Sequence, residues 1–379
     1  MNFPRGSCMN VRRFALAFAV PALLAGGVGA GVGCSDSETA VDPVPVLEAL
    51  TTNVILPEYA AFDAGSVELA QSADAFAKGP DATTLNALRA SWRKARLAYR
   101  TLDAVRFGPA EDIALSTAID DHATNAEAIE AFLSGADAVD TTLFSKLGSN
   151  KVGFFAIEYL IFVPTNDPAT AGTAPNPPKS DAEVLAKFTG DAGVRRRTFV
   201  AVLAAKVAEL AKSVNETWKT SYADALRKPG NALFPSAKSG MDRILGNLVN
   251  GLETVVKQDL GTPVGQYTAG KVQPSSVRTV RSDNAVAEIR ASLAGSSSVY
   301  FGAKGSVGFA QLVQARNKTV DGRVATAAAA VTTACEPLAS PFAESLERDN
   351  AKVRAAYEAV NAEKRVLATD VASVLGITI

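Results

Sequence analysis

One acidic residue stands in an otherwise apolar run, GFFAIEYLIF, at residues 153–162. A buried carboxylate destabilises a fold by several kcal/mol unless it is paired, so we expect Glu158 either to face water or to have a partner. The run could form three helical turns or a buried strand, and the helical patterns around it favour a helix. In a helix, residue 155 lies one turn before Glu158 on the same face. A histidine there would give two metal ligands, but Phe155 has no lone pair to offer.

The chain has one histidine, His122, which follows Asp120 and Asp121. Consecutive helical residues point in different directions, so this run is a poor metal site, and Asp120 or Asp121 is explained more simply as the N-cap of a helix in ATNAEAIEAFL. One histidine and no G-x-S-x-G leave no Ser-His or Cys-His arrangement. Phosphate-binding and dinucleotide fingerprints are absent too. The sequence therefore predicts no catalytic residues, no bound metal and no cofactor.

Composition points to a helical protein. The 379 residues are 47% hydrophobic and 7% aromatic, with a net charge of −1. This length allows a sizeable core and two domains, and the charge balance gives no reason to expect a nucleic-acid partner. Alanine and leucine are abundant and strand signals are scarce, which favours helices.

The N-terminus reads as a targeting segment. Arg5, Arg12 and Arg13 precede the apolar FALAFAVPALLAGGVGAGVG, and Cys34 follows at once. We interpret residues 1–33 as a signal peptide and GVGC as similar to a bacterial lipobox, with Gly31 where leucine is usual. Cys34 would then carry the lipid anchor and 34–44 would form the tether; cleavage without lipid is the alternative. Only Cys34 and Cys335 remain after processing, so no disulfide framework is expected.

Helix signals recur after the tether. We expect a helix opening at Pro80-Asp81 whose Trp92 and Tyr99 lie in the core. Further expected helices are one from the Ser180–Glu183 capping box towards Tyr222, one over Asp242–Leu260 ended by a C′ glycine at Gly261, and a last one from Ser340-Pro341 to Leu375-Gly376. The Pro-rich stretch 165–180 predicts a linker or long loop between helical domains at 45–164 and 181–379.

Several segments together resemble the imelysin family, bacterial envelope proteins linked to iron uptake. GFFAIEYLIF is similar to its G-x-H-x-x-E signature, with Gly153 and Glu158 in place and Phe155 at the histidine position. SWRKARLAYRTLDAVRFGPAED resembles its Trp-x-x-x-Arg-x-x-Tyr helix and the corner after it, and DLGTPVG resembles its K-x-G-x-P-x-G turn. The resemblance extends from about residue 45 to 379.

This resemblance implies an all-α fold of two helical-bundle domains with approximate internal symmetry and a site between them. The implied ligand-binding cleft would contain Gly153, Phe155, Glu158, Arg106, Arg278 and Thr279. In PSSVRTVRSDNAVAEI, Arg278, Thr279 and Ala285 occupy places where the family tends to have Glu-Ser and a further Ser. A His and Glu at i and i+3 could hold iron or zinc; with Phe155 in that place, we expect the metal site to be lost.

Each of these residues also has a structural explanation. Glu158 could be an acid at the solvent edge of its helix or one paired with an arginine. Arg278 could be a surface charge, or it could replace a lost metal charge beside Glu158. Arg106 could clamp the helix-to-loop corner with its fork of donors.

Two functions of different classes remain. We favour a non-catalytic envelope lipoprotein, membrane-anchored through Cys34 and facing the periplasm or the cell surface, that binds an unknown ligand or partner related to iron or haem uptake. The alternative is a metallopeptidase-like enzyme that uses other metal ligands. A purely structural descendant with an empty cleft is a third reading.

Lipid attachment at Cys34 is directly testable. Several acyl chains, at about 0.8 kcal/mol per buried CH₂, would anchor the chain stably. We expect Cys34→Ala to abolish incorporation of labelled fatty acid and to prevent mature processing at that residue. A wild-type mature N-terminus at another residue, with no lipid on Cys34, would contradict this reading.

Overall fold

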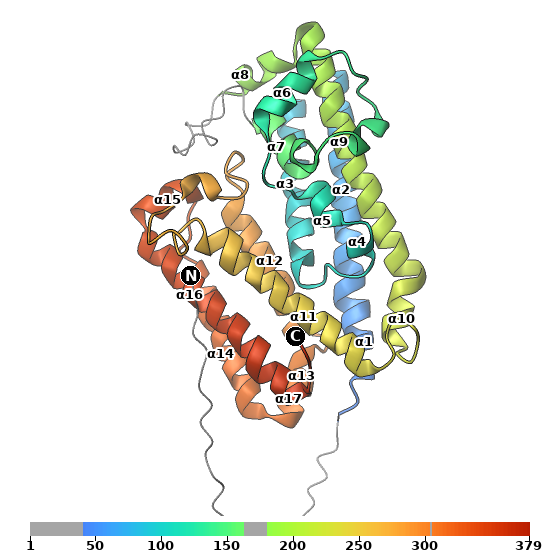
Figure 1. The fold of residues 1–379 in the computed structure, drawn as a ribbon, viewed down its shortest axis with the longest axis vertical. Coiled ribbons are helices and arrows are strands. Elements are labelled where there is room, and N and C mark those ends of the chain that lie inside the picture. Colours follow the sequence, from blue (N-terminus) through green and yellow to red (C-terminus); the bar gives the residue numbers. More distant parts are fainter. Residues whose placement is uncertain (1–40, 163–179, 304) are drawn as a thin grey trace, which may run out of the picture. The chain divides into compact units, whose positions relative to one another are not determined.

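Helices make up all the regular structure of residues 41–162, 180–303 and 305–379, the part of the chain that the computed structural model describes (Figure 1). The predicted all-α fold class is confirmed. The predicted signal peptide 1–33, Cys34, most of the 34–44 tether and nearly all of the 165–180 linker lie outside these residues. No helix within them is long and apolar enough to cross a membrane.

One group of helices is built on α2 (Leu56–Lys78), α3 (Ala82–Thr101) and α9 (Gly190–Thr217), with α7 (Gly153–Phe162) packed against α3 and α9 (Figure 1). Helix α3 begins as predicted, because the Asp81 carboxylate accepts a hydrogen bond from the Thr84 amide at 2.7 Å. Trp92 and Tyr99 are fully buried on its inner face, which confirms that they are core residues.

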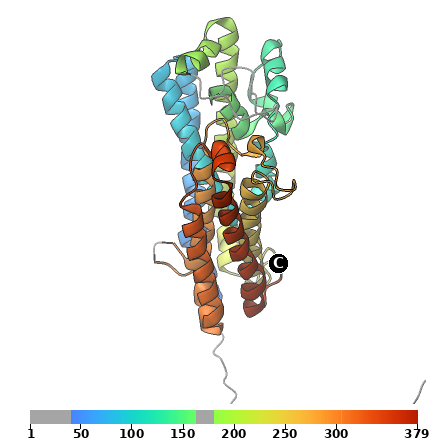
Figure 2. The same cartoon turned by 90° about the vertical axis from the view of Figure 1, so that its left-hand side faces the viewer.

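A second group contains α11 (Ala237–Thr254), α12 (Ala285–Phe301), α14 (Lys318–Cys335) and α16 (Asn350–Val366). Helices α14 and α16 run side by side (Figure 2), and α11 packs against α12 and α16. The shorter helices are α1 (Val44–Leu50), α4 (Pro109–Asp112), α5 (Leu115–Ile119), α6 (Ala126–Ser134), α8 (Asp181–Leu185), α10 (Ala223–Arg227), α13 (Phe309–Arg316), α15 (Phe342–Arg348) and α17 (Ala372–Leu375).

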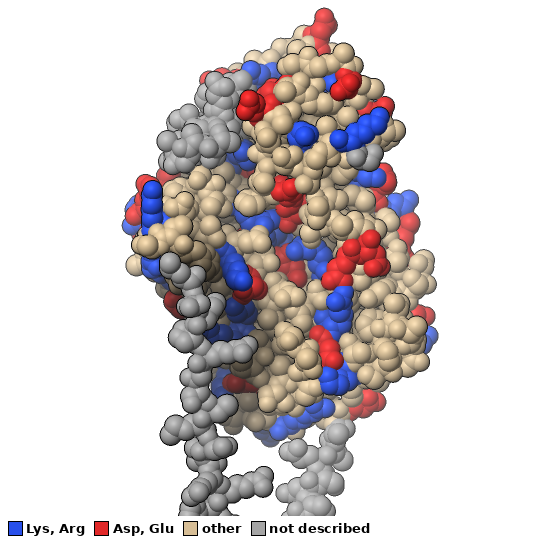
Figure 3. All heavy atoms as spheres, viewed as in Figure 1, with Lys and Arg blue, Asp and Glu red and all other residues tan. Residues whose placement is uncertain are grey.

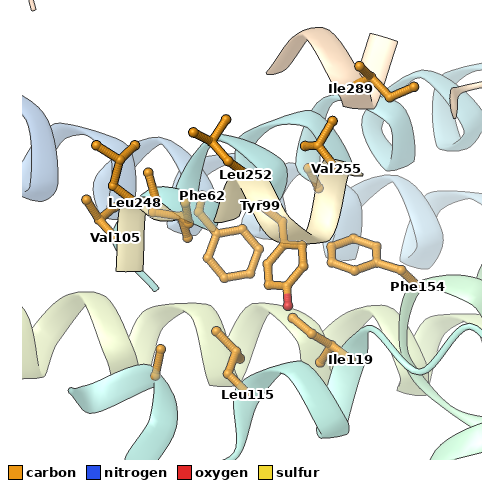
Figure 4. Packing of buried hydrophobic residues seen from close by; sticks show 14 of the residues in the cluster. Phe62, Tyr99, Val105, Leu115, Ile119, Phe154, Leu248, Leu252, Val255 and Ile289 are labelled. Carbon is orange, nitrogen blue, oxygen red and sulfur yellow. The ribbon is translucent and has the colours of Figure 1, made fainter. Parts of the chain in front are cut away.

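The hydrophobic core is shared between early and late helices. Figure 4 shows Leu248, Leu252 and Val255 beside the rings of Phe62 and Tyr99. Helix α9, which lies after the predicted linker, packs mainly against α2, which lies before it. The division into two domains at 165–180 therefore remains a prediction. Helices from the two sides of this segment are in extensive contact.

Several predicted helix ends differ from the structure. The Ser180–Glu183 capping box is present, but α8 is short, and α9 begins separately at Gly190, which has a positive φ of 66°. Helix α11 begins at Ala237 rather than Asp242, because Ser236 provides the N-cap by accepting from the Ser239 amide at 3.2 Å. The predicted last helix is interrupted at Asp349, between α15 and α16, and a π turn at Leu367–Val371 joins α16 to α17. Only its end at left-handed Gly376 is confirmed.

Gly261 does not act as the predicted left-handed C′ residue. It lies at the end of a π-helical turn, Val255–Gly261, that continues α11. A Cβ there would lie 2.6 Å from the Val256 carbonyl oxygen. Glycine is therefore required because the backbone of the π turn passes too close for a side chain. Similar π turns occur at Thr51–Ile55, Trp218–Tyr222 and Leu367–Val371.

Close packing of α12 on the end of α3 depends on Gly295, where a Cβ would lie 2.1 Å from the Thr101 carbonyl oxygen. We expect Gly295→Ala to lower the free energy of unfolding by about 1–3 kcal/mol through overpacking. Gly246 in α11 is the control, because a Cβ there meets nothing within 4 Å, and Gly246→Ala should stabilise the protein by about 0.5–1 kcal/mol. Urea unfolding followed by circular dichroism would measure both; equal effects would contradict the packing argument.

Candidate functional site

The signature helix α7 is fixed at its first residue. Gly153 has a φ of 74°, and a Cβ on it would lie 2.5 Å from the Ile119 carbonyl oxygen, so only glycine is accommodated. The Trp92 indole donates to the Phe154 carbonyl oxygen at 3.0 Å. These two constraints set the direction of α7 and hence the positions of Phe155 and Glu158.

Glu158 is fully buried and has a partner. Its Oε1 accepts hydrogen bonds from the Ser282 amide at 2.9 Å and the Ser282 hydroxyl at 2.7 Å. Burial raises the pKa of Glu158, and the charge of Arg281 together with the Ser282 donors offsets part of that rise. The expectation that this acid lies at a solvent edge is therefore wrong.

Phe155 lies where a metal-binding imidazole would be expected, and two guanidinium groups face its ring. Arg96 is 4.8 Å and Arg278 is 5.4 Å from the ring centroid. The side chain is only 2% exposed. Such contacts are favourable cation–π interactions. Phe155 therefore stabilises two guanidinium groups at the place where a histidine would bind a metal ion.

Beneath Phe155 lies a cluster of ionised side chains, which we call the buried charge cluster. Its members are Arg96, Arg100, Arg106, Arg278, Asp103, Asp120, Asp259 and Glu288. All are buried except Arg106 and Asp120, which are partly buried. Arginines and acids are equal in number, as a buried cluster requires if charges are not to remain unpaired.

Arg96 is the centre of one half of this cluster. Its Nε and Nη2 donate to the two Glu288 oxygens at 3.1 and 2.9 Å, and its Nη1 pairs with Asp120. This two-pronged geometry is the strongest form of an arginine–carboxylate pair. Since Arg96 is in α3 and Glu288 is in α12, the pair connects helices nearly 200 residues apart.

Arg100 is the centre of the other half, pairing with Asp103 and Asp259. Arg106 pairs with Asp103 at 2.6 Å, which supports the clamp expected at this corner. Asp103 also accepts from the Ser292 hydroxyl at 2.7 Å. Asp259 lies in the π turn Val255–Gly261, whose altered register directs it inward.

Arg278 is neither a surface charge nor a partner of Glu158. It pairs with Asp120 at 2.7 Å, lies 3.7 Å from Asp259 and donates to Gln258. Burial alone would raise the pKa of Asp120, but Arg278 and Arg96 hold that pKa well below its usual value. The acids of the cluster therefore balance the charge of Arg278.

A pocket of about 140 Å³ opens beside Phe155, with Arg278, Thr279 and His122 in its wall. Thr279 has a φ of 48°, a strained conformation for a β-branched residue. Its buried hydroxyl has no hydrogen-bond partner among the described residues. The pocket can receive a small polar group beside Arg278 and Thr279.

His122 is exposed at the mouth of this pocket, with its ring 6.1 Å from that of Phe155. Partial burial and the charge of Arg278 lower the pKa of His122, so it is neutral near pH 7. The predicted N-cap role of the preceding aspartates is wrong, because Asn125 caps α6 by accepting from the Ala128 amide at 2.9 Å.

The structure brings Phe155, Arg278 and Thr279 into one pocket, with Gly153 and Glu158 on the helix that bears Phe155. Arg106 belongs to the buried charge cluster and not to the pocket wall. Among the described residues, no group of three or more His, Cys, Asp or Glu side chains is placed to hold a metal ion. On the face shown in Figure 3, positive and negative side chains are interspersed.

The sequence predicted no role for Arg96, Ser282 or Glu288, and for Asp120 it predicted only an N-cap. Arg96 could have been found, because it lies four residues after Trp92 and three before Tyr99, on the buried face of α3. Ser282 and Glu288 carry no comparable local signal.

Comparison with known proteins gives a consistent result. The sequence model of the imelysin family matches residues 55–367. Iron-regulated protein A of Synechococcus elongatus is 23% identical over 288 residues, covering 72% of this chain and 70% of that protein.

Two crystal structures share the fold. A putative iron-regulated protein A precursor from Parabacteroides distasonis has a TM-score of 0.69 at 16% identity, covering 91% of this chain and 96% of that one. An imelysin-like protein from Psychrobacter arcticum has a TM-score of 0.67 at 16% identity, covering 90% and 97%.

Because the pKa of Glu158 is raised, ionisation of this carboxyl group should lower the free energy of unfolding as pH rises. An acid whose folded pKa exceeds its unfolded pKa stabilises the fold at low pH, and that contribution is lost as pH rises above the unfolded value of 4.5. We therefore expect Glu158→Gln to become more stable relative to the wild type as pH rises from 4.5, because the amide keeps an acceptor for Ser282.

Chemical denaturation at a series of pH values would measure this difference. Glu127→Gln, a change at an exposed position of α6, is the control and should show no such trend. A difference for Glu158→Gln that stays constant with pH would contradict the assignment.

Proposed function

Because this chain belongs to the imelysin family, we propose that it is a non-catalytic envelope lipoprotein whose pocket beside Phe155 binds one polar group of a ligand or partner. The observation that carries the proposal is the setting of Phe155. Where a metal-binding histidine would be expected, an aromatic ring packs against Arg96 and Arg278. A cation in the pocket would meet the guanidinium group of Arg278 and, at the pocket mouth, the single imidazole of His122, whereas an anionic group would meet a positive charge.

We further propose that the ligand is related to iron or haem. The Synechococcus relative and one structural neighbour both bear the name iron-regulated protein A. A pocket of about 140 Å³ is small for a whole drug-sized ligand. The pocket is large enough for one carboxylate group of an iron chelate or of a porphyrin, and the rest of that ligand would lie outside the pocket.

Envelope anchoring through Cys34 and the division into two helical domains with internal symmetry belong to the same proposal. The first is supported by the sequence of residues 1–34. The second is supported by the presence of two groups of helices, one around α2, α3 and α9 and one around α11, α12, α14 and α16. These groups do not follow the predicted bounds, because α9 lies after residues 165–180 but packs in the first group.

A metallopeptidase-like enzyme is the second candidate, and one observation favours it. His122 is neutral and lies at the same pocket, so its imidazole could replace the missing histidine of the signature. Its neighbours are already engaged, however. Asp120 pairs with two arginines, Asp121 accepts from Ala123 and Ser149, and Glu158 accepts from Ser282.

Metal titration separates the two candidates. With the full chain carrying Cys34→Ala, we expect calorimetry to show no one-to-one binding of Fe²⁺ or Zn²⁺ that depends on Glu158, and no metal-dependent peptide cleavage. Phe155→His should add weak binding at most, because Glu158 is engaged with Ser282 and two guanidinium groups remain; Phe155→Leu is the control. Tight wild-type binding lost in His122→Ala, together with cleavage, would favour the enzyme.

Ligand binding tests the pocket itself. We expect ferric citrate to bind, and Ala123→Trp, at an exposed lining position, to weaken binding at least tenfold by filling the pocket mouth. Ala123→Ser is the matched control and should bind like the wild type. Equal binding by all three chains, or no binding by any, would contradict the proposed ligand or its place.

A further inference from the structure

A second and larger cavity, of about 650 Å³, lies between α12, α14 and α16. It has no lining residue in common with the pocket beside Phe155. Four α12 residues line one wall at spacings of three and four: Arg290, Leu293, Ala294 and Ser297. Four α14 residues line the opposite wall at the same spacings: Ala328, Val331, Thr332 and Cys335. Each helix therefore presents one continuous face to the cavity.

The hollow follows from the sequence of α14. Its C-terminal part, ATAAAAVTTAC, contains only small side chains. Helix α14 packs closely against α16, but these short side chains do not reach α12. A volume of about 650 Å³ is within the range of small-molecule sites, which run from roughly 300 to 1,000 Å³.

One acid reaches the cavity from α16. Glu363 is 7% exposed, and no hydrogen bond or ion pair joins it to another described residue. The next residue, Lys364, is engaged with Glu253. Glu158 and Glu288, the other buried glutamates, both have donors. An unpaired buried carboxylate is costly, so Glu363 is an acceptor left available inside a cavity.

The other charged and titratable groups around the cavity do not neutralise Glu363. Arg290 donates to the carbonyl oxygens of Cys335, Glu336 and Leu338 at 3.1–3.4 Å, at the end of α14. Burial raises the pKa of the Cys335 thiol to about 11, so it is uncharged. Glu336 is exposed and adds a second negative charge at the rim. The cavity thus lacks one positive group.

We propose that this cavity binds an amphiphile in which a protonated amine is joined to an apolar body. The ammonium group donates to the Glu363 carboxylate, and the body packs against Leu293, Val331 and Cys335. A metal ion fits less well, because Glu363 has no second and third ligand beside it among the described residues. A carboxylate ligand would be repelled by Glu363 and Glu336.

The proposal predicts a pH dependence. Burial raises the pKa of Glu363 to about 7. Below that pH the carboxyl group is protonated and cannot form an ion pair, and above it the carboxylate is available. An alkylamine stays protonated up to about pH 9, as its pKa is near that of lysine. Affinity should therefore rise as pH increases from 6 to 8.

The test uses three probes with the same body and different heads: 4-phenylbutylamine, 4-phenylbutanol and 4-phenylbutyrate. Calorimetric titration of the full chain carrying Cys34→Ala should show the amine binding at least tenfold more tightly than the alcohol at pH 8, and the butyrate most weakly. The preference for the amine should fall severalfold at pH 6.

Variants locate the site. Glu363→Gln should reduce amine affinity at least tenfold at pH 8 while leaving alcohol affinity within about twofold, which shows that the cavity is intact. Glu358→Gln, at an exposed position of α16, is the matched control and should change neither. Val331→Trp should fill the cavity and weaken both ligands.

Equal affinity for amine and alcohol, or an amine affinity unaffected by Glu363→Gln, would overturn the role of Glu363. Failure of every probe to bind would overturn the site. Neither result would bear on the pocket beside Phe155, since the two cavities are lined by different residues.

Discussion

The structure depends on the buried charge cluster, because its two parts are each unbalanced alone. The chain up to residue 120 contributes Arg96, Arg100, Arg106, Asp103 and Asp120, three positive and two negative groups with a net charge of +1. The chain after residue 258 contributes Arg278, Asp259 and Glu288, with a net charge of −1. If only one of these two sets were buried, one of its charges would remain unpaired. Helices α3 and α12 must therefore pack together for this part of the core to form. Removing one partner of a buried pair costs about 3–5 kcal/mol.

The pocket is a consequence of this cluster. Arg96 and Arg278 are fixed by their acids and so present their guanidinium groups to Phe155. The strained Thr279 follows Arg278 and precedes Ser282, which is bound to Glu158. Strained residues persist where the surroundings over-determine them. Here the ion pair of Arg278 on one side and the hydrogen bonds of Ser282 on the other hold Thr279 in this conformation.

Local features of the fold could be predicted from the sequence, and long-range ones could not. The Asp81 cap, the Ser180–Glu183 box, the end at Gly376 and the burial of Trp92 depend on residues within a few positions of each other. The partner of Glu158 is 124 residues away, and the Arg278–Asp120 pair spans 158 residues. Nothing in the local pattern distinguishes Arg278 from a solvated arginine, whereas Arg96 lies on the buried face of α3. The π turn that directs Asp259 inward also has no sequence signal of its own.

A double-mutant cycle on Arg96 and Glu288 tests the central role of the cluster most directly. The free energy of unfolding would be measured by urea denaturation for the wild type, Arg96→Met, Glu288→Gln and the double variant. We expect each single change to cost about 3–5 kcal/mol. The double change should cost little more than one of them, which is a coupling above about 2 kcal/mol. Losses that simply add would show that the pair is not coupled and that the cluster does not hold α3 and α12 together.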